Sequence, residues 1–131
     1  MCVLCDDPGA TGDVVYEDDE TAVVLHADWA VRGHAMVIAR RHVENASQLE
    51  EAEWLQLARV WQRTERVLLE LTRADRAIVM KLGIQTPHLH VHIYPVPAAA
   101  SRGDVFDAID AKTSVPRDER FVEACRQALN P

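Results

Sequence analysis

The sequence predicts an α+β fold in which short strands and turns surround one long helix and a C-terminal helix follows. Three observations predict it: β-prone runs separated by turns, one long segment with helical periodicity, and a terminal segment with its own apolar stripe. A length of 131 residues suits one hydrophobic core. We therefore expect residues 1–131 to form a single domain.

Three strands are expected before the long helix. Residues 14–16 and 22–25 are β-prone runs on either side of an acidic turn, which predicts a hairpin. After Gly33, residues 34–39 form an apolar run that ends at two arginines, as a buried strand would.

The long helix is expected over residues 47–72. Ser47 and Glu50 have the spacing of a capping box, in which two side chains satisfy free backbone N–H groups at a helix start. Apolar side chains then recur close to a 3.6-residue period, which predicts one face packed on the sheet. The side chains of that face are Trp54, Leu57, Ala58, Trp61, Leu68 and Leu71.

The second half of the chain adds two strands and a terminal helix. Residues 77–80 and 88–96 are the expected strands, and two prolines should end the second because proline cannot donate to a sheet ladder. Residues 98–117 are rich in loops, with a helical turn expected at 105–109. The apolar side of the terminal helix comprises Phe121, Val122, Cys125 and Leu129.

The net charge, the length of the apolar runs and the N-terminal residues limit the classes of function that the chain can have. A net charge of −7 disfavours sequence-independent binding to a nucleic acid backbone. No apolar run approaches the roughly 18 residues of a membrane span, and the N-terminal residues do not resemble a secretory signal. We therefore expect a soluble cytoplasmic protein that binds neither a membrane nor a nucleic acid.

Three histidines at alternate positions are the most informative pattern. In a strand, alternation sends the rings of His88, His90 and His92 to one face and the apolar residues between them to the other. Imidazoles about 7 Å apart gain little from packing, but they can act as nucleophile, proton donor or metal ligand. The alternative, an exposed polar face on an edge strand, would not require histidine at all three positions. The pattern therefore indicates a binding or catalytic face.

A second group of residues has the chemistry of a metal site. Cys2 and Cys5 have the Cys-x-x-Cys spacing, which suits a metal better than a disulfide in a reducing compartment. With two of the six histidines they would offer two thiolates and two imidazoles, a suitable tetrahedral set for structural zinc. Such a zinc would have four protein ligands and no water to activate. The alternative is a cysteine pair without metal.

Residues 88–94 (HLHVHIY) resemble the histidine-triad (HIT) superfamily, whose motif is His-φ-His-φ-His-φ-φ with φ apolar. The likeness covers about residues 2–97 and includes the four metal positions of the zinc-bearing branch, which are Cys2, Cys5, His42 and His88 here. Residues 98–131 belong to the variable C-terminal region. The resemblance implies an antiparallel α+β fold, usually a homodimer. It also implies a purine nucleotide as substrate, cleaved at its α-phosphorus.

The resemblance further implies roles for individual residues. His90 would attack phosphorus, giving a nucleotidyl-histidine that water hydrolyses. His92 would donate to a non-bridging phosphate oxygen and stabilise the charge of the transition state. Gln85 would add a neutral donor, or be merely a polar loop residue. His34 would support the active site, or be a capping or core histidine.

One departure from the family pattern concerns the ribose contact. His26 stands where many members carry an aspartate that holds the ribose hydroxyls, and Asp28 lies two residues later. Three alternatives follow: His26 contacts ribose itself, Asp28 substitutes through a shifted loop, or the substrate lacks this feature.

The leading hypothesis is a nucleotide hydrolase or nucleotidyl transferase acting on a nucleoside phosphoramidate or a dinucleoside polyphosphate. The alternative is a nucleotide-binding or scaffold protein of the same family with little turnover. A third hypothesis makes the three histidines part of a catalytic metal centre.

Overall fold

The structure, a computed structural model, describes residues 2–131. Its strands are β1 (Gly12–Glu17), β2 (Thr21–His26), β3 (Ala35–Ala39), β4 (Arg76–Met80) and β5 (His90–Val96). Its α-helices are α1 (Val3–Asp6), α2 (Glu51–Thr72), α3 (Arg102–Ile109) and α4 (Glu119–Leu129). The predicted α+β fold is confirmed.

All the strands form one antiparallel sheet with the order β1-β2-β3-β5-β4. The predicted hairpin is the β1–β2 pair. β5 lies between β3 and β4, where His90 pairs with Ile38 and His92 pairs with Met80. The histidine strand is therefore an inner strand, which excludes the exposed polar face of an edge strand as the reason for its histidines.

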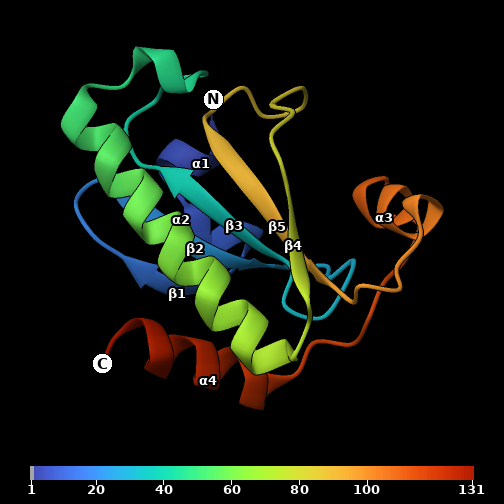
Figure 1. Cartoon of the computed structure of the whole chain (residues 1–131). Helices are drawn as coiled ribbons and strands as arrows, with labels where there is room; N and C mark the ends of the chain where they lie inside the picture. The colour runs from blue at the N-terminus through green and yellow to red at the C-terminus, as the bar shows by residue number, and fades with distance from the viewer. Residues whose placement is uncertain (1) are drawn as a thin grey trace.

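One face of the sheet carries the main hydrophobic core, covered by α2 and α4 (Figure 1). Val91 and Ile93, the apolar residues between the histidines of β5, point into this core. The terminal helix buries all four side chains expected of it: Phe121, Val122, Cys125 and Leu129. Burial of this apolar surface is the main contribution to the stability of the fold.

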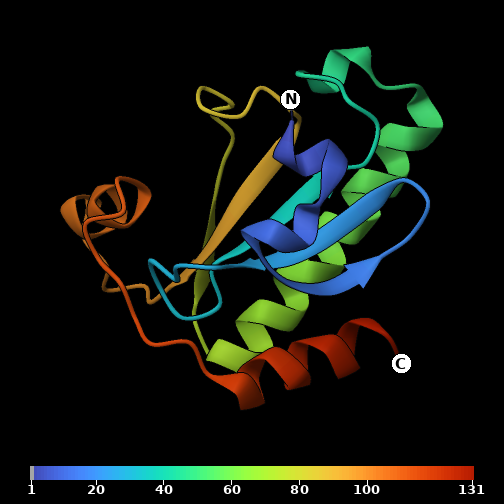
Figure 2. The same ribbon diagram turned by 180° about the vertical axis from the view of Figure 1, so that it is seen from behind.

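The opposite face carries two smaller apolar clusters. Leu4 of α1 packs on β2 and β3, and Ala108 of α3 packs on Tyr94 and Val96 of β5. Figure 2, the view from behind, shows β5 between α1 and α3. The histidines of β5 thus lie on the part of the sheet between these two covering segments.

The long helix differs from the prediction at its start and at both ends of its buried face. Asn45 and Gln48 cap each other's backbone in a short 3-10 turn at 46–48, so Ser47 does not cap the helix. α2 begins only at Glu51, after a second reciprocal pair formed by Glu50 and Glu53. The buried positions of α2 are Leu57, Val60, Thr64, Val67 and Leu68.

Two large side chains of the expected helix face are exposed instead. Trp54 is 39% exposed and Leu71 is 36% exposed. Both lie in the end turns of α2, beyond the positions that contact the core.

The boundaries of β5 and α3 also need correction. β5 begins at His90, two residues later than predicted, because His88 lies in a bend before it. The strand ends at Val96 as predicted, although Pro95 lies inside it, paired with Ala77. The helical turn expected at 105–109 is the second half of α3. That helix begins at Arg102, where Asp104 N–H donates to the Ser101 hydroxyl. Within residues 2–131, no helix has the length and apolar character needed to cross a membrane.

Candidate functional site

His90 and His92 lie side by side on β5, and both are half-buried. Their ring centroids are 5.1 Å apart, with an angle of 64° between the rings. His92 is paired with Met36 of β3 and Met80 of β4, whereas His90 is paired only with Ile38 of β3, so the sheet fixes the backbone of both. Two imidazoles held this rigidly can act together on one small group.

The hydrogen bond of His90 determines which of its ring nitrogens is free. Its Nδ1 lies 2.6 Å from the main-chain carbonyl oxygen of His88. Because a carbonyl can only accept, Nδ1 carries the proton and donates it. In the neutral ring, Nε2 is then left with its lone pair, the form that a nucleophile or base requires.

A chain of hydrogen bonds assigns the opposite tautomer to His92. Ala30 N–H donates to Nδ1 of His34 at 3.4 Å, so the proton of that neutral ring lies on Nε2. His34 Nε2 lies 2.9 Å from His92 Nδ1 and therefore donates to it. The proton of His92 must then lie on its Nε2. His90 offers a lone pair and His92 an N–H donor.

Burial keeps His34 and His92 neutral, as this chain of hydrogen bonds requires. His34 is 4% exposed, and burial lowers its pKa to about 3, with further lowering by His26 and His92. Burial also lowers the pKa of His92 to about 4, assisted by the neighbouring rings of His90 and His26. Gly33, at φ +83°, makes the turn that delivers His34 to this position just before β3.

His26 extends the histidine cluster, whereas Asp28 does not. The His26 ring stacks on His34 at 4.6 Å and lies 6.0 Å from His92, centroid to centroid. Its Nδ1 lies 3.0 Å from Asp28 N–H, which donates to it. The Asp28 side chain itself is exposed.

The remaining predicted contact, Gln85, lies in the exposed loop between β4 and β5. Over residues 2–131, its side chain forms no hydrogen bond with another part of the protein. It is free to reach a ligand, but nothing in the fold directs it at His90.

Sequence reasoning missed Tyr94. Its ring stacks on His34 at 4.3 Å, centroid to centroid, and burial raises its pKa to about 12. It is one of the groups that exclude water from His34. The alternation that selected His90 and His92 would have found Tyr94 as well, had it been continued by one more step along the strand.

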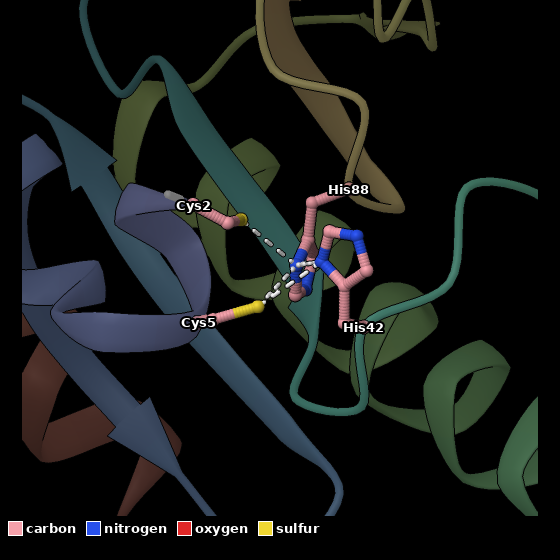
Figure 3. Close-up of side chains that lie close together, drawn as sticks. All are labelled: Cys2, Cys5, His42 and His88. Carbon is pink, nitrogen blue, oxygen red and sulfur yellow. Dashed lines mark hydrogen bonds between the residues drawn. The ribbon is translucent and has the colours of Figure 1, made fainter.

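The second predicted group, Cys2, Cys5, His42 and His88, also comes together (Figure 3). One ligand atom from each residue lies within 4.8 Å of the other three. The two sulfurs come from the first turn of the chain, His42 from the segment after β3 and His88 from the bend before β5. This cluster joins three segments that are distant in sequence.

The donor geometry fits a tetrahedral metal ion. The Nδ1 atom of His88 lies 3.4 Å from Cys2 Sγ, 3.3 Å from Cys5 Sγ and 3.1 Å from His42 Nδ1. Ligands at zinc distances of about 2.0–2.3 Å and tetrahedral angles would be roughly 3.3–3.8 Å apart. His88 Nε2 donates to the carbonyl of Ala39, so Nδ1 has a lone pair for a metal. The residues present therefore can hold a metal ion.

These contacts correct the expectation that all three histidines act on one face. Both ring nitrogens of His88 are engaged elsewhere, and the residue is only 1% exposed. Within residues 2–131, the cluster containing His88 is the only group of His, Cys, Asp and Glu with metal-site spacing, and it excludes His90 and His92. The hypothesis of a catalytic metal held by the three histidines is therefore wrong.

A cavity of about 400 Å³ lies elsewhere, at the far end of β5. Pro95 and Pro97 line it together with Arg32, Arg73 and Asp107, and no histidine takes part. The candidate site is therefore identified by the hydrogen bonds and ring contacts of its histidines and not by this cavity.

Comparison with known proteins relates the chain to one family. The HIT domain family matches residues 8–98, the part that contains the sheet and α2. An uncharacterized HIT-like protein of Methanocaldococcus jannaschii is 27% identical over 101 residues, which are 72% of this chain and 78% of that protein.

Solved structures have the same fold. A hypothetical histidine triad nucleotide-binding protein from Sulfolobus tokodaii superimposes with a TM-score of 0.70 and 25% identity, covering 98% of this chain and 89% of that one. A zinc-bound histidine triad family protein from Mycobacterium smegmatis gives a TM-score of 0.73 at 22% identity, covering 98% and 93%. Both comparisons extend beyond residue 98 and include the C-terminal helices.

Proposed function

The chain belongs to the HIT domain family, and we propose that it is a nucleotide hydrolase or nucleotidyl transferase. Its substrate would be a nucleoside phosphoramidate or a dinucleoside polyphosphate, attacked at the α-phosphorus by His90. One observation carries the proposal: the His90 Nδ1–H donates to the His88 carbonyl at 2.6 Å, which leaves Nε2 as a lone-pair nucleophile.

The first step forms one bond and breaks another. The Nε2 lone pair of His90 attacks the phosphorus, and the bond from phosphorus to the leaving oxygen or nitrogen breaks, with its electron pair going to the leaving group. The product is a nucleotidyl-histidine. Water then attacks the same phosphorus, releases a nucleoside monophosphate and returns the lone pair to Nε2.

His92 supplies the donor for the negative charge that builds up on the phosphoryl oxygens. The hydrogen bond from His34 keeps the His92 proton on Nε2, so the donor is aligned before substrate arrives. His34 is a positioning residue in this scheme, because it acts through His92 and not on the substrate.

His26 is the residue best placed to contact the rest of the nucleotide. Its ring is half-buried beside His34 and His92, while Nδ1 is held by the Asp28 backbone. We assign the ribose contact to His26 and keep Asp28 and Gln85 as exposed contacts that a bound nucleotide would have to order.

Zinc is the metal that this cluster of two thiolates and two imidazoles favours. Cys2, Cys5, His42 and His88 would hold it and leave no open position. When bound, zinc would cross-link three segments and supply no chemistry at the phosphorus. A reducing cytoplasm would keep both thiols available for it.

A homodimer is the expected assembly. β4 is an edge strand of the sheet, and its apolar side chains from Ala77 to Met80 are half-buried. An edge strand of this kind can pair with another chain. Light scattering on the purified protein should give the mass of two chains, and a monomer at micromolar concentration would contradict the assignment.

The activity is tested with wild type and His90→Ala on a panel of adenosine and guanosine phosphoramidates and dinucleoside polyphosphates. Mass spectrometry should detect an acid-labile nucleotidyl adduct on wild type only. Turnover that survives in His90→Ala would exclude the covalent route. Nucleotide binding by wild type without turnover or adduct would favour the scaffold alternative instead.

A further inference from the structure

Two of the three cysteines are placed where an oxidant can reach them. Cys5 is exposed and Cys2 is half-buried, whereas Cys125 is completely buried in the main core. Cys2 and Cys5 flank one helical turn, in which Cys5 N–H donates to the Cys2 carbonyl at 3.2 Å. The N-terminal pair therefore differs from Cys125 in access to solvent.

The two sulfurs are also close to each other. Both lie within 3.4 Å of the same atom, Nδ1 of His88. Cys2 precedes the first residue of α1 and has an extended backbone, at φ −115° and ψ 115°, so the chain end can adjust without unwinding a long helix. A Cys-x-x-Cys pair at a helix start is a favourable arrangement for a disulfide.

His88 connects this pair to the proposed nucleophile. Its ring belongs to the metal cluster, while its main-chain carbonyl accepts the proton of His90 Nδ1 at 2.6 Å. The N–H of the same peptide group is also held, since Leu89 N–H donates to the Val43 carbonyl at 2.6 Å. A change in the ligands of the metal therefore acts on the residue that fixes the tautomer of His90.

We propose that Cys2 and Cys5 are an oxidation site that releases the metal and loosens His90 through His88. The consequence for catalysis rests on the proposed function, but the chemistry at the cysteines does not. The oxidant class is a hydroperoxide, which is reduced as the thiolates are oxidised.

The reaction proceeds in two steps. The exposed Cys5 thiolate attacks one oxygen of the hydroperoxide, the O–O bond breaks, and Cys5 becomes a sulfenic acid while hydroxide or alkoxide leaves. The Cys2 thiolate then attacks the sulfur of Cys5 and expels hydroxide, forming the disulfide. Two thiolates lose two electrons in total, and the hydroperoxide gains them. With both thiolates consumed, His42 and His88 alone cannot hold the zinc.

The test uses the zinc-loaded full chain, hydrogen peroxide and a chromogenic zinc chelator. Peroxide should release about one zinc per chain, remove two of the three free thiols and give a Cys2–Cys5 disulfide in peptide mapping. Hydrogen exchange of the peptide containing His88 to His90 should become faster. Turnover should fall about tenfold or more, and dithiothreitol with zinc should restore all five readings.

Cys125→Ala is the matched control, because it removes the one thiol outside the pair and should respond to peroxide as wild type does. In Cys5→Ser the disulfide cannot form. Zinc and thiols that persist in wild type at peroxide levels that oxidise a free Cys-x-x-Cys peptide would overturn the proposal. So would a disulfide that leaves exchange at His88–His90 unchanged. A protein with no turnover at all would contradict the proposed function, while the zinc, thiol and exchange readings would still decide the oxidation site.

Discussion

His88 and His90 are two residues apart and alike in sequence, yet the structure prepares them for different tasks. His88 directs one ring nitrogen at the Ala39 carbonyl and the other at Cys2, Cys5 and His42, so neither is left for a substrate. His90 has one nitrogen held by a carbonyl, and within residues 2–131 the other nitrogen has no hydrogen-bond partner. In both rings one nitrogen donates to a carbonyl. What each histidine can do therefore depends on the partner of its other nitrogen, more than on its position in the motif.

The largest effects should come from removing each of the two histidine rings in turn. His90→Ala should reduce kcat by about 10³-fold or more, because it removes the proposed nucleophile. It should leave zinc content and Tm close to wild type, since His90 is not a metal ligand. His88→Ala should instead lower the zinc content, because it removes one of the four residues of the metal cluster. Steady-state kinetics, elemental analysis and thermal melts check both variants, and zinc loss in His90→Ala would break the comparison.

Removal of the metal should have the next largest effect, and mainly on stability. Zinc at about 1,000 times its Kd would contribute about 4 kcal/mol to the free energy of unfolding. A strong chelator should therefore lower Tm by roughly 10 °C or more in a protein of this size. Differential scanning calorimetry with and without chelator measures this. A metal-free wild type with an unchanged Tm would contradict a structural metal.

Substitution of His34 tests the proposed difference in protonation between His90 and His92. His34→Ala removes the donor to His92 and should lower kcat by about 10²-fold. His34→Gln places an amide N–H near the position of Nε2 and should recover part of the loss. Tm alone would not distinguish a structural role from a positioning role, but this rescue would. Equal activity of the two variants would count against the assigned hydrogen bond.

The smallest expected effect is the share of His34 in the pH dependence of stability between about pH 7 and pH 5. The pKa of His34 falls from 6.5 to about 3 on folding, and that of His92 falls to about 4. Below pH 6.5 the unfolded chain therefore takes up protons that the folded chain does not. The stability that these groups provide is complete above pH 6.5 and is lost as pH falls toward 4, by up to about 1.4 kcal/mol per pH unit for each histidine.

Urea unfolding of wild type and His34→Gln between about pH 7 and pH 5 measures this slope. The variant shares the metal cluster, so the difference between the two slopes isolates His34. A slope as steep in the variant as in wild type would contradict a neutral buried His34.

Much of the fold could be predicted from the spacing of apolar residues along the sequence. The hairpin, the inner strands and the terminal helix were predicted because alternation and 3.6-residue periodicity record which side chains meet the core. The start of α2 was not, because two reciprocal caps follow each other and the sequence does not say which one opens the helix.

The donor chemistry of the metal cluster could be predicted by residue type, whereas the choice of His42 and His88 among six histidines came from the resemblance to the zinc-bearing branch. The roles of His90 and His92 stay predictions. The tautomers of His34, His90 and His92 depend on backbone groups of Ala30 and His88, and any residue type supplies those groups. Such contacts leave no trace in the sequence.

The proposed roles of His88 as metal ligand, His90 as nucleophile and His92 as donor are tested most directly by nitrogen NMR of the histidine rings in the zinc-loaded protein. We predict the proton of His90 on Nδ1, the proton of His92 on Nε2, and a His88 ring with a proton on Nε2 and metal on Nδ1. A His90 ring protonated on Nε2, or a His88 ring that does not respond to zinc, would contradict the account.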